Sequence, residues 1–345
     1  MGAIDLLLKV QDWSDAVKQF AMEPGQTVAS RIFQRARRPV AGDTARWDVV
    51  KFPRRLGPIV GDDAAPPLVN PNDREPMSAP LIHVKISKRL SAYKLSDWRA
   101  AGQSVPDVAA EIRDEFAGLK KVGMATVEKA CMGALLGSIN TADFEGSQVT
   151  FNLTQAVETR NGGQWTAAAT AILSTELQAL TDAYVQKCGL VPGLTIINDV
   201  TETYLLKNTE IQTWGRYTLG ARFFDLAGNA GTEAVFGGEQ FAGMRWVKTI
   251  GGYVPTGGAF TKFLADKKVL TLPADVTETL MLAEGYGIVP TAFVGGEGEI
   301  PFRRVQGEYA YTRWCDAPQG VELVWGYRFL PVVKNTTAVL VTTVT

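Results

Sequence analysis

The sequence predicts a fold of the α+β class organised around one unusually long helix. Apolar residues recur at three- and four-residue spacing from Ser104 to Ser138, which is typical of an amphipathic helix. Between residues 161 and 208 a helical pattern, a short apolar strand and a second helical pattern follow one another, which indicates a mixed α/β layer. From Phe236 onward most predicted elements are strands.

Composition describes an ordered chain without a strong overall charge. The 345 residues, 46% of them hydrophobic, are enough to bury a large core in one elaborated domain or two. With 35 basic and 36 acidic residues the net charge is −1, so no overall field attracts nucleic acid or an anionic membrane. Cys131, Cys188 and Cys315 are far apart in apolar surroundings, which favours buried thiols in a reducing compartment.

The first residues do not resemble a targeting or membrane segment. Met1–Val10 has no basic leader, and no stretch reaches the roughly 20 apolar residues of a membrane span. We expect a soluble chain made in the cytosol.

The N-terminal region predicts two short helices and a basic cluster. The apolar stripe of 6–20, which includes Trp13 and Phe20, must dock on another surface, and a second helix is expected over 28–36. A solvated face paired with neighbouring acids is favoured over a nucleic-acid arm, because no aromatic platform accompanies the basic residues. The cluster consists of Arg31, Arg35, Arg37 and Arg38.

The sequence predicts one long hairpin with arms over 47–60 and 81–90. In the second arm Ile82, Val84 and Ile86 alternate with polar residues at period two. The connecting segment, 61–80, is rich in proline, aspartate and asparagine, which favours turns. A loop this long is unusual inside a compact domain, so we expect it to project and to contact a neighbour.

The long helix has a clear start and end. Ser104 is the expected N-cap and Gly137 the expected stop, which gives a length of about 50 Å at ~1.5 Å per residue. Gly118, Gly123 and Gly133 each cost about 1 kcal/mol relative to alanine, and close packing across the helix would explain them. The alternative is two consecutive helices broken near Gly123.

The rest of the chain predicts a further helix pair and a strand-rich end. We expect a strand over 143–153, a helix over 166–188 closed by Gly189, a strand over 194–197, and a helix over 199–208 capped by Asp199 or Thr201. The glycine-rich stretches 251–258 and 295–298 lack the features of a phosphate loop and are expected to be loop tips. Later strands are expected over 244–250, 269–272, 279–282, 308–314, 321–333 and 338–344.

No catalytic constellation is recognisable. His83 is the single histidine, so a histidine metal cluster is excluded, and a nucleophilic device would need His83 on a projecting hairpin. A plain surface or interface histidine is favoured instead. We expect no enzyme activity and no cofactor or metal. The amphipathic N-terminal segment and the long hairpin are both expected to extend beyond the core of the chain, as symmetric assemblies require.

In the order and local character of these parts, the sequence resembles the major capsid proteins of tailed double-stranded DNA bacteriophages, most closely the lambda-like group. Residues 54–60 followed by a polar tip resemble that family's E-loop, and 105–137 resembles its spine helix in the P-domain. The run 188–192 before a buried strand resembles its A-domain, and 313–318 leading into 321–331 resembles its C-terminal sheet.

The resemblance implies the tailed-phage and herpesvirus type of major capsid fold. Its implied parts are an N-arm (1–42), an E-loop (43–95), a P-domain (96–160) that contains the spine helix 104–138, an A-domain (161–290), and C-terminal strands (291–345) shared between the last two.

The implied function is structural: hexamers and pentamers of an icosahedral shell that encloses double-stranded DNA. Implied partners are other copies, a portal, a scaffold or maturation protease, a possible decoration protein and non-specifically packaged DNA, with no membrane; assembly is expected in the host cytoplasm and the mature location is the virion capsid. Lys85 and Lys88 lie near the region where some members carry a crosslinking lysine. Alternatives are a shell of the same fold around an enzyme cargo, and a monomeric α/β enzyme. The implied inter-subunit residues are Trp13, Phe20, Arg31, Arg35, Arg37, Arg38, Arg54, Arg55, His83, Lys85 and Lys88.

Overall fold

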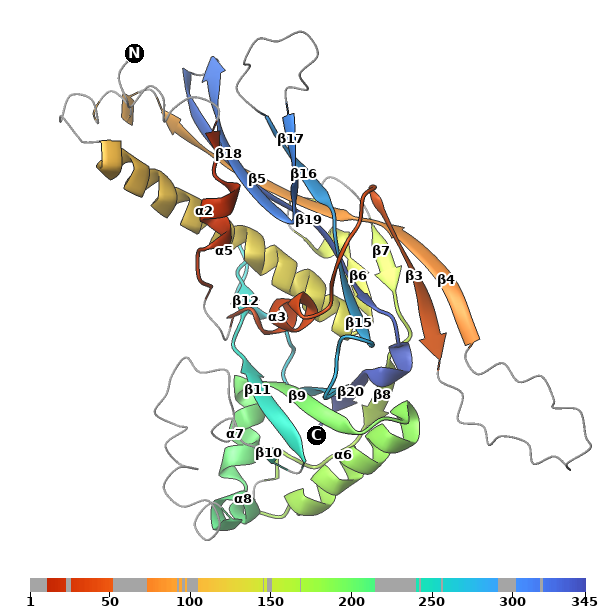
Figure 1. Ribbon diagram of the computed structural model, residues 1–345. Helices are drawn as coiled ribbons and strands as arrows, with labels where there is room; N and C mark the ends of the chain where they lie inside the picture. The colour runs from red at the N-terminus through yellow and green to blue at the C-terminus, as the bar shows by residue number, and fades with distance from the viewer. Residues whose placement is uncertain are drawn as a thin grey trace, which may run out of the picture.

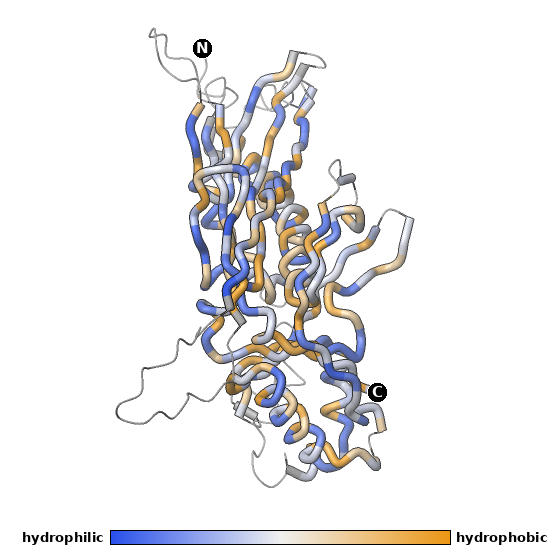
Figure 2. The backbone as a smooth tube through the Cα atoms, turned by 90° about the vertical axis from the view of Figure 1, so that its right-hand side faces the viewer, coloured by the Kyte–Doolittle hydropathy of each residue, from blue (hydrophilic) through white to orange (hydrophobic). Residues whose placement is uncertain are grey.

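Two six-stranded sheets and one 31-residue helix form the framework of the protein (Figure 1). The computed structural model describes residues 11–22, 26–51, 73–91, 93–94, 97, 105–144, 146–147, 151–167, 169–214, 240–241, 243–255, 257–290, 302–316 and 319–345. Along the strands, hydrophobic and hydrophilic residues alternate in many places, as expected for sheets with one buried face (Figure 2).

The first sheet carries the long helix on one face. Its longest strand, β19, pairs with β5 along one side; along the other side it pairs with β18 over Gln319–Tyr327 and with β15 over Phe329–Val333. The N-terminal region adds a strand at each end, β1 beside β18 and β2 beside β15. Its strands are β1 (Gln11–Asp12), β2 (Arg37–Pro39), β5 (Ile82–Ser91), β15 (Leu280–Glu284), β18 (Glu308–Asp316) and β19 (Gln319–Val333).

The predicted long helix is confirmed as one continuous element, α5 (Val105–Leu135). Gly123 explains why it is not broken: a Cβ there would overlap the indole ring of Trp325, which is fully buried on β19. The glycine therefore lets the helix approach the sheet closely. Gly118 has open space instead, and the expected cap Ser104 lies outside the described residues.

The N-terminal region forms shorter helices than predicted. Helix α3 (Val28–Gln34) agrees with the prediction for 28–36, but α2 spans only Ser14–Lys18, and residues 6–10 lie outside the described residues. A helix through Gln11–Asp12 is wrong, because that backbone pairs with the edge of β18. Asp12 Oδ1 then accepts a hydrogen bond from the Ser14 amide at 2.9 Å, at the start of α2.

The predicted hairpin has a different second arm. Strand β3 (Thr44–Lys51) pairs with β4 (Asp73–Pro80), which lies inside the segment expected to be a turn-rich tip. Pro76 and Pro80 are tolerated because β3 and β4 form a two-stranded sheet, whose outer edges need no amide donors. The expected arm 81–90 is β5, and it pairs with β19 in the first sheet.

The second sheet forms an α/β layer with helices α6 (Leu173–Cys188), α7 (Asp199–Lys207) and α8 (Thr209–Trp214). Helix α6 begins later than predicted, because the amides of Trp165 and Thr166 both donate to the carbonyl of Thr345. Gly189 closes α6 in the left-handed conformation, as predicted. The strands, in spatial order, are β10 (Gln240–Phe241), β11 (Met244–Thr249), β9 (Pro192–Asn198), β14 (Lys268–Pro273), β20 (Leu340–Thr343) and β8 (Glu158–Asn161).

The cap of α7 is Asn198, not Asp199 or Thr201: its side-chain oxygen accepts from the Thr201 amide at 2.8 Å. The strand expected over 143–153 is found only at 152–153; it is wrong for 143–144, 146–147 and 151, and residues 145 and 148–150 lie outside the described residues. A 3-10 turn (Thr141–Asp143) instead follows β6 (Ser138–Asn140), which pairs with β7 (Asn152–Thr154). Two further hairpins are β12 (Gly252–Tyr253) with β13 (Thr261–Lys262), and β16 (Tyr286–Pro290) with β17 (Phe302–Gln306).

One hydrophobic core joins α5 to both sheets, since it includes Phe116, Trp325 and Leu270. A second cluster lies between the second sheet and α6 to α8, around Trp165 and Trp246. None of the three cysteines, all of which are described, forms a disulfide; Cys131 and Cys188 are buried as expected, whereas Cys315 is only half-buried.

Candidate functional site

The N-terminal region is held against the long helix by a buried carboxylate. Glu128 of α5 accepts hydrogen bonds from the amides of Ala29 and Ser30 in the first turn of α3, each at 2.7 Å. These are donors that a helix cannot satisfy internally, and the helix dipole favours an anion at this end. Desolvation raises the pKa of Glu128 to about 7, against the opposing effect of the two amides and of nearby Arg31.

A buried cation of the same helix holds the preceding helix. The Nζ of Lys120 donates to the carbonyl of Val17, in the last turn of α2, at 2.9 Å, and lies 3.1 Å from a carboxylate oxygen of Glu308. The Lys120 side chain is 5% exposed. A cation at a helix C-terminus and an anion at a helix N-terminus both match the helix dipole, so α5 binds the two N-terminal helices by complementary charge.

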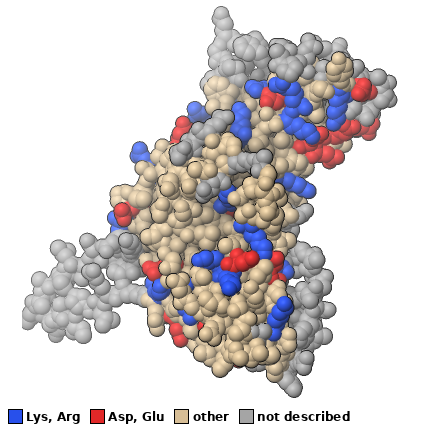
Figure 3. Space-filling model, turned by 180° about the vertical axis from the view of Figure 1, so that it is seen from behind, with Lys and Arg blue, Asp and Glu red and all other residues tan. Residues whose placement is uncertain are grey.

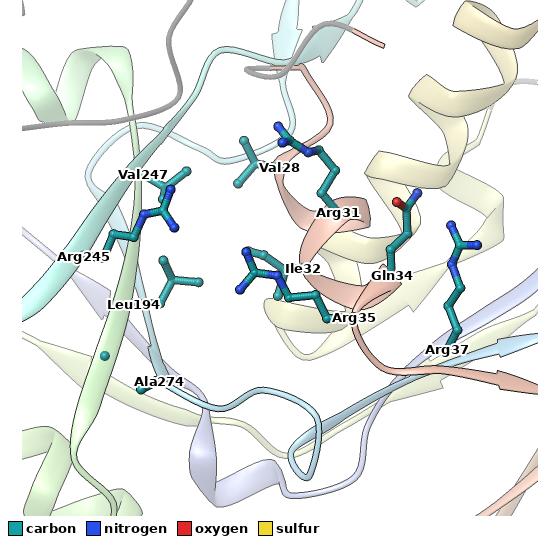
Figure 4. Close-up of a pocket in the computed structure, with 11 residues that line it drawn as sticks. Val28, Arg31, Ile32, Gln34, Arg35, Arg37, Leu194, Arg245, Val247 and Ala274 are labelled. Atoms are coloured by element: carbon teal, nitrogen blue, oxygen red, sulfur yellow. The ribbon is translucent and has the colours of Figure 1, made fainter. Parts of the chain in front are cut away.

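Next to this anchor, a pocket of about 520 Å³ lies between α3 and the second sheet. Arg31 and Arg35 of α3, Arg37 of β2 and Arg245 of β11 line it, and no acidic residue is among its eleven lining residues. Figure 4 shows the guanidinium groups of Arg35 and Arg245 pointing toward one another across the cavity. Val28, Ile32, Leu194, Val247 and Ala274 contribute apolar surface.

The four arginines of this pocket differ in their partners. Arg37 Nε lies 3.5 Å from the buried carboxylate of Glu284, and Arg31 is close enough to Glu128 to lower the pKa of that carboxyl. Arg35 and Arg245 form no ion pair within the described part of the chain. Within the described residues, the pocket therefore holds two guanidinium groups without an ion-pair partner, and guanidinium groups bind carboxylates and phosphates.

The other N-terminal residues predicted to act between subunits lie in different places. Trp13 packs in the chain's own core, with its ring centroid 5.8 Å from that of Phe116 on α5. Phe20 is half-buried against the same core, and Arg38 is exposed on β2, outside the arginine-lined pocket. Arg54 and Arg55 lie outside the described residues. The apolar stripe predicted over 6–20 therefore packs, at Trp13 and Phe20, against the core of its own chain.

The predicted residues of β5 face the surface of the first sheet. His83 Nε2 and the Tyr309 hydroxyl are 2.6 Å apart, and partial burial together with the cations Arg328 and Lys85 lowers the pKa of His83 to about 4. Lys88 forms an ion pair with Glu115 of α5, and its hydrogen bond lowers the pKa of that carboxyl. Lys88 is thus occupied within the chain, whereas Lys85 has no ion pair among the described residues.

Sequence reasoning missed Arg245, Glu128 and Lys120. Arg245 comes from β11, far along the chain from the basic cluster, and no local pattern connects the two. Glu128 did carry a signal: with Met124, Cys131 and Leu135 it falls on one helical face, and all four residues are buried. A carboxylate within an apolar stripe must find partners there, which could have marked it as an anchor.

The described part of the face opposite to that in Figure 1 shows no field of one sign (Figure 3). In Figure 3, Lys and Arg atoms lie interspersed with Asp and Glu atoms. Among the described residues there is no group of histidine, cysteine, aspartate or glutamate side chains that could hold a metal ion. Nor does any helix in that part of the chain have the length and apolar character needed to cross a membrane.

Comparisons with known proteins agree with this architecture. The chain is similar over 97% of its length to the structure of a putative capsid protein of a prophage in E. coli CFT073, covering 99% of that chain with a TM-score of 0.60 and 10% identity. A phage-related protein from Bordetella bronchiseptica RB50 aligns over 96% of this chain and 95% of its own, with a TM-score of 0.53 and 10% identity. The capsid of cyanophage P-SCSP1u aligns over 100% and 95%, with a TM-score of 0.50 and 11% identity.

At identities of 10–11%, this structural similarity shows a shared fold. A search of curated protein sequences finds no match. The family model for phage major capsid protein E, however, matches residues 14–285, which is most of the chain. This match, together with the fold, confirms the predicted resemblance and the predicted capsid fold. The chain therefore belongs to the phage major capsid protein E family and is a structural protein of the phage capsid.

Proposed function

We propose that this protein assembles into hexamers and pentamers that close an icosahedral shell around double-stranded DNA, and that the basic N-terminal cluster and the β3–β4 hairpin join neighbouring copies. The observation that carries the proposal is the family match over residues 14–285, supported by the placement of the hairpin. Figure 1 shows β3 and β4 extending away from the body of the molecule.

The β3–β4 hairpin packs on the core of its own chain along its described length. Buried in the main core are Ala45, Trp47, Val49 and Ala79. Val50, near the end of β3, donates to the carbonyl of Lys334 at 3.0 Å. In the described part of the chain β3 and β4 pair only with each other. Strand edges without a strand partner can pair with another chain, which supports contact with a neighbouring subunit.

The remaining partners follow from the family. We infer that a portal and a scaffold or maturation protease act with the shell, with a decoration protein as a further candidate partner. We also infer that assembly takes place in the host cytoplasm and that the protein has no enzymatic role. The net charge of −1 supports a container wall that holds DNA without binding it tightly.

Electron microscopy of the purified protein tests assembly. The sharpest variant replaces residues 52–72 by Asn-Gly, since Lys51 and Asp73 are directly paired and a two-residue turn can connect them. We expect a folded subunit that no longer forms closed shells. The matched control replaces 291–301 in the same way between Pro290 and Phe302, which are also directly paired, and it should still assemble. Closed shells from the first variant would contradict the proposed role of the hairpin.

Removing residues 1–38 is not a usable test of the N-terminal region. Val17 and Phe33 are fully buried in the main core, so their removal would unfold the subunit and not only remove contacts between subunits.

Nuclease-protected double-stranded DNA in particles from infected cells distinguishes a phage head from a compartment that holds an enzyme. A protein that stays monomeric at all concentrations would contradict both of these shell functions.

A further inference from the structure

We infer that the pocket lined by Arg31, Arg35, Arg37 and Arg245 binds a carboxylate-bearing segment of a second copy of this chain. The inference deepens the proposed function and rests on it, since a second copy is present only if the protein assembles. It assigns an acidic peptide with a neighbouring apolar side chain as the ligand, and Arg35 and Arg245 as the residues that hold its carboxylate.

The charges that line the pocket favour an anionic ligand. Two residues far apart in sequence, Arg35 on α3 and Arg245 on β11, point into one cavity whose lining contains no acid (Figure 4). Neither forms an ion pair within the described residues, although Arg37 beside them does so with Glu284. Two like charges at one cavity favour an incoming anion, and guanidinium groups bind carboxylates with two parallel hydrogen bonds.

The apolar part of the lining favours a peptide over nucleic acid. Val28, Ile32 and Val247 are buried or nearly so at the wall of the pocket, with Leu194 beside them. A DNA duplex presents phosphates on the outside of a wide rigid rod and has no apolar group to place against such a wall. A short peptide can insert a carboxylate and an apolar side chain together, which is the usual composition of a binding cavity.

The charge balance of the whole chain favours another copy as the source of the peptide. The chain carries 35 basic and 36 acidic residues, so its unpaired cations must be balanced by unpaired acids elsewhere on the same chain. Asp15 and Asp114 are examples: both are exposed and form no ion pair within the described part. Copies of such a chain neutralise one another when they associate through two different patches, which is how heterologous contacts build rings and shells.

One experiment determines which group occupies the pocket in the assembled particle. In a cryo-electron microscopy reconstruction at side-chain resolution, we expect an Asp or Glu of a neighbouring copy within about 4 Å of the guanidinium of Arg35 or Arg245, the separation of a direct ion pair. A closed shell whose pocket is empty or holds nucleic acid would overturn this inference and leave the proposed function intact. A protein that forms no shell at all would instead refute the proposed function.

A second experiment uses the unassembled subunit and so does not depend on shells. The probe is the peptide acetyl-Glu-Leu-Glu-Glu-Leu-Glu-amide, with binding followed by titration calorimetry. We expect the pair of substitutions Arg35→Gln and Arg245→Gln to weaken binding about tenfold or more, which corresponds to the loss of about 1.4 kcal/mol. The matched control is Arg38→Gln, in the same basic cluster but outside the pocket, and it should leave binding within about twofold.

Two further probes, inorganic phosphate and a short DNA duplex, test the alternative ligands. Inorganic phosphate should bind more weakly than the peptide, and a short DNA duplex should not compete with it. The inference is overturned if peptide binding does not depend on Arg35 and Arg245, or if the duplex displaces the peptide from the wild-type subunit. Circular dichroism of each variant shows whether the subunit remains folded, so that a loss of binding is assigned to the pocket.

Discussion

Glu128 attaches the N-terminal region to α5, and its removal is expected to lower the stability of the folded subunit. The substitution Glu128→Ala leaves the amides of Ala29 and Ser30 buried without acceptors, since both residues are at most 1% exposed. Each unsatisfied buried donor costs about 1 to 3 kcal/mol, so we expect a loss of about 2 to 6 kcal/mol in the free energy of unfolding. Urea unfolding of the purified subunit, followed by tryptophan fluorescence, measures this loss.

The pH dependence of Glu128→Gln tests the mechanism more closely. The pKa of Glu128 in the folded protein, about 7, lies above its ordinary value of 4.5, so the folded state binds more protons between these values than the unfolded state does. The contribution of this group to stability is therefore greatest below pH 4.5 and declines as pH rises to about 7. The difference of about 2.5 pKa units corresponds to about 3 kcal/mol at most.

Glutamine cannot titrate, so it lacks this dependence. We expect the stability of the wild-type protein relative to Glu128→Gln to increase by up to about 3 kcal/mol when pH is lowered from about 8 to about 5. The control is Glu111→Gln, a carboxylate of the same helix whose side chain is 39% exposed. If the relative stability instead rises with pH, the amide hydrogen bonds outweigh desolvation, and the reasoning about this carboxylate is refuted.

Two further predictions concern the helix–sheet contact and the single histidine. Gly123→Ala should destabilise the subunit by about 1 to 3 kcal/mol, because the new methyl group overlaps the Trp325 ring, whereas Gly118→Ala, with open space around it, should raise stability by up to about 1 kcal/mol; equal thermal shifts in the two variants would argue against close packing at Gly123. Because His83 is the one histidine, its imidazole gives one NMR titration, which should have its midpoint near pH 4; a midpoint near the ordinary value of 6.5 would show that partial burial and the cations Arg328 and Lys85 do not act on it.

Local patterns along the chain were sufficient to predict much of the fold. The apolar spacing of 105–135 is a property of one helix, and Gly189 adopts the left-handed conformation that ends α6, so both were readable without tertiary information. The order of the parts was likewise enough to indicate the capsid family, which the family match then confirmed.

Which strands pair is not a local property, and here the sequence misled. The alternation in 82–86 correctly predicts a strand, but the expected partner was the arm 47–60, which overlaps β3, whereas the actual partner, β19, lies about 230 residues away. The choice depends on burial: Val84 and Leu90 are covered only when β5 joins the sheet that carries α5. The cap of α7 shifted by one residue for a similar reason, since Asn198 also bonds the Leu264 carbonyl and Asp266.

The sequence by itself determined the long helix, the basic cluster near residue 35 and the near-neutral charge, because each is set by the identity and spacing of neighbouring residues. Only the tertiary structure brought Arg245 beside Arg35, placed Glu128 at the start of α3 and moved Trp13 into the chain's own core. These contacts join segments separated by about a hundred residues or more. Their formation depends on the packing of whole sheets and helices, and no pattern within a single segment encodes it.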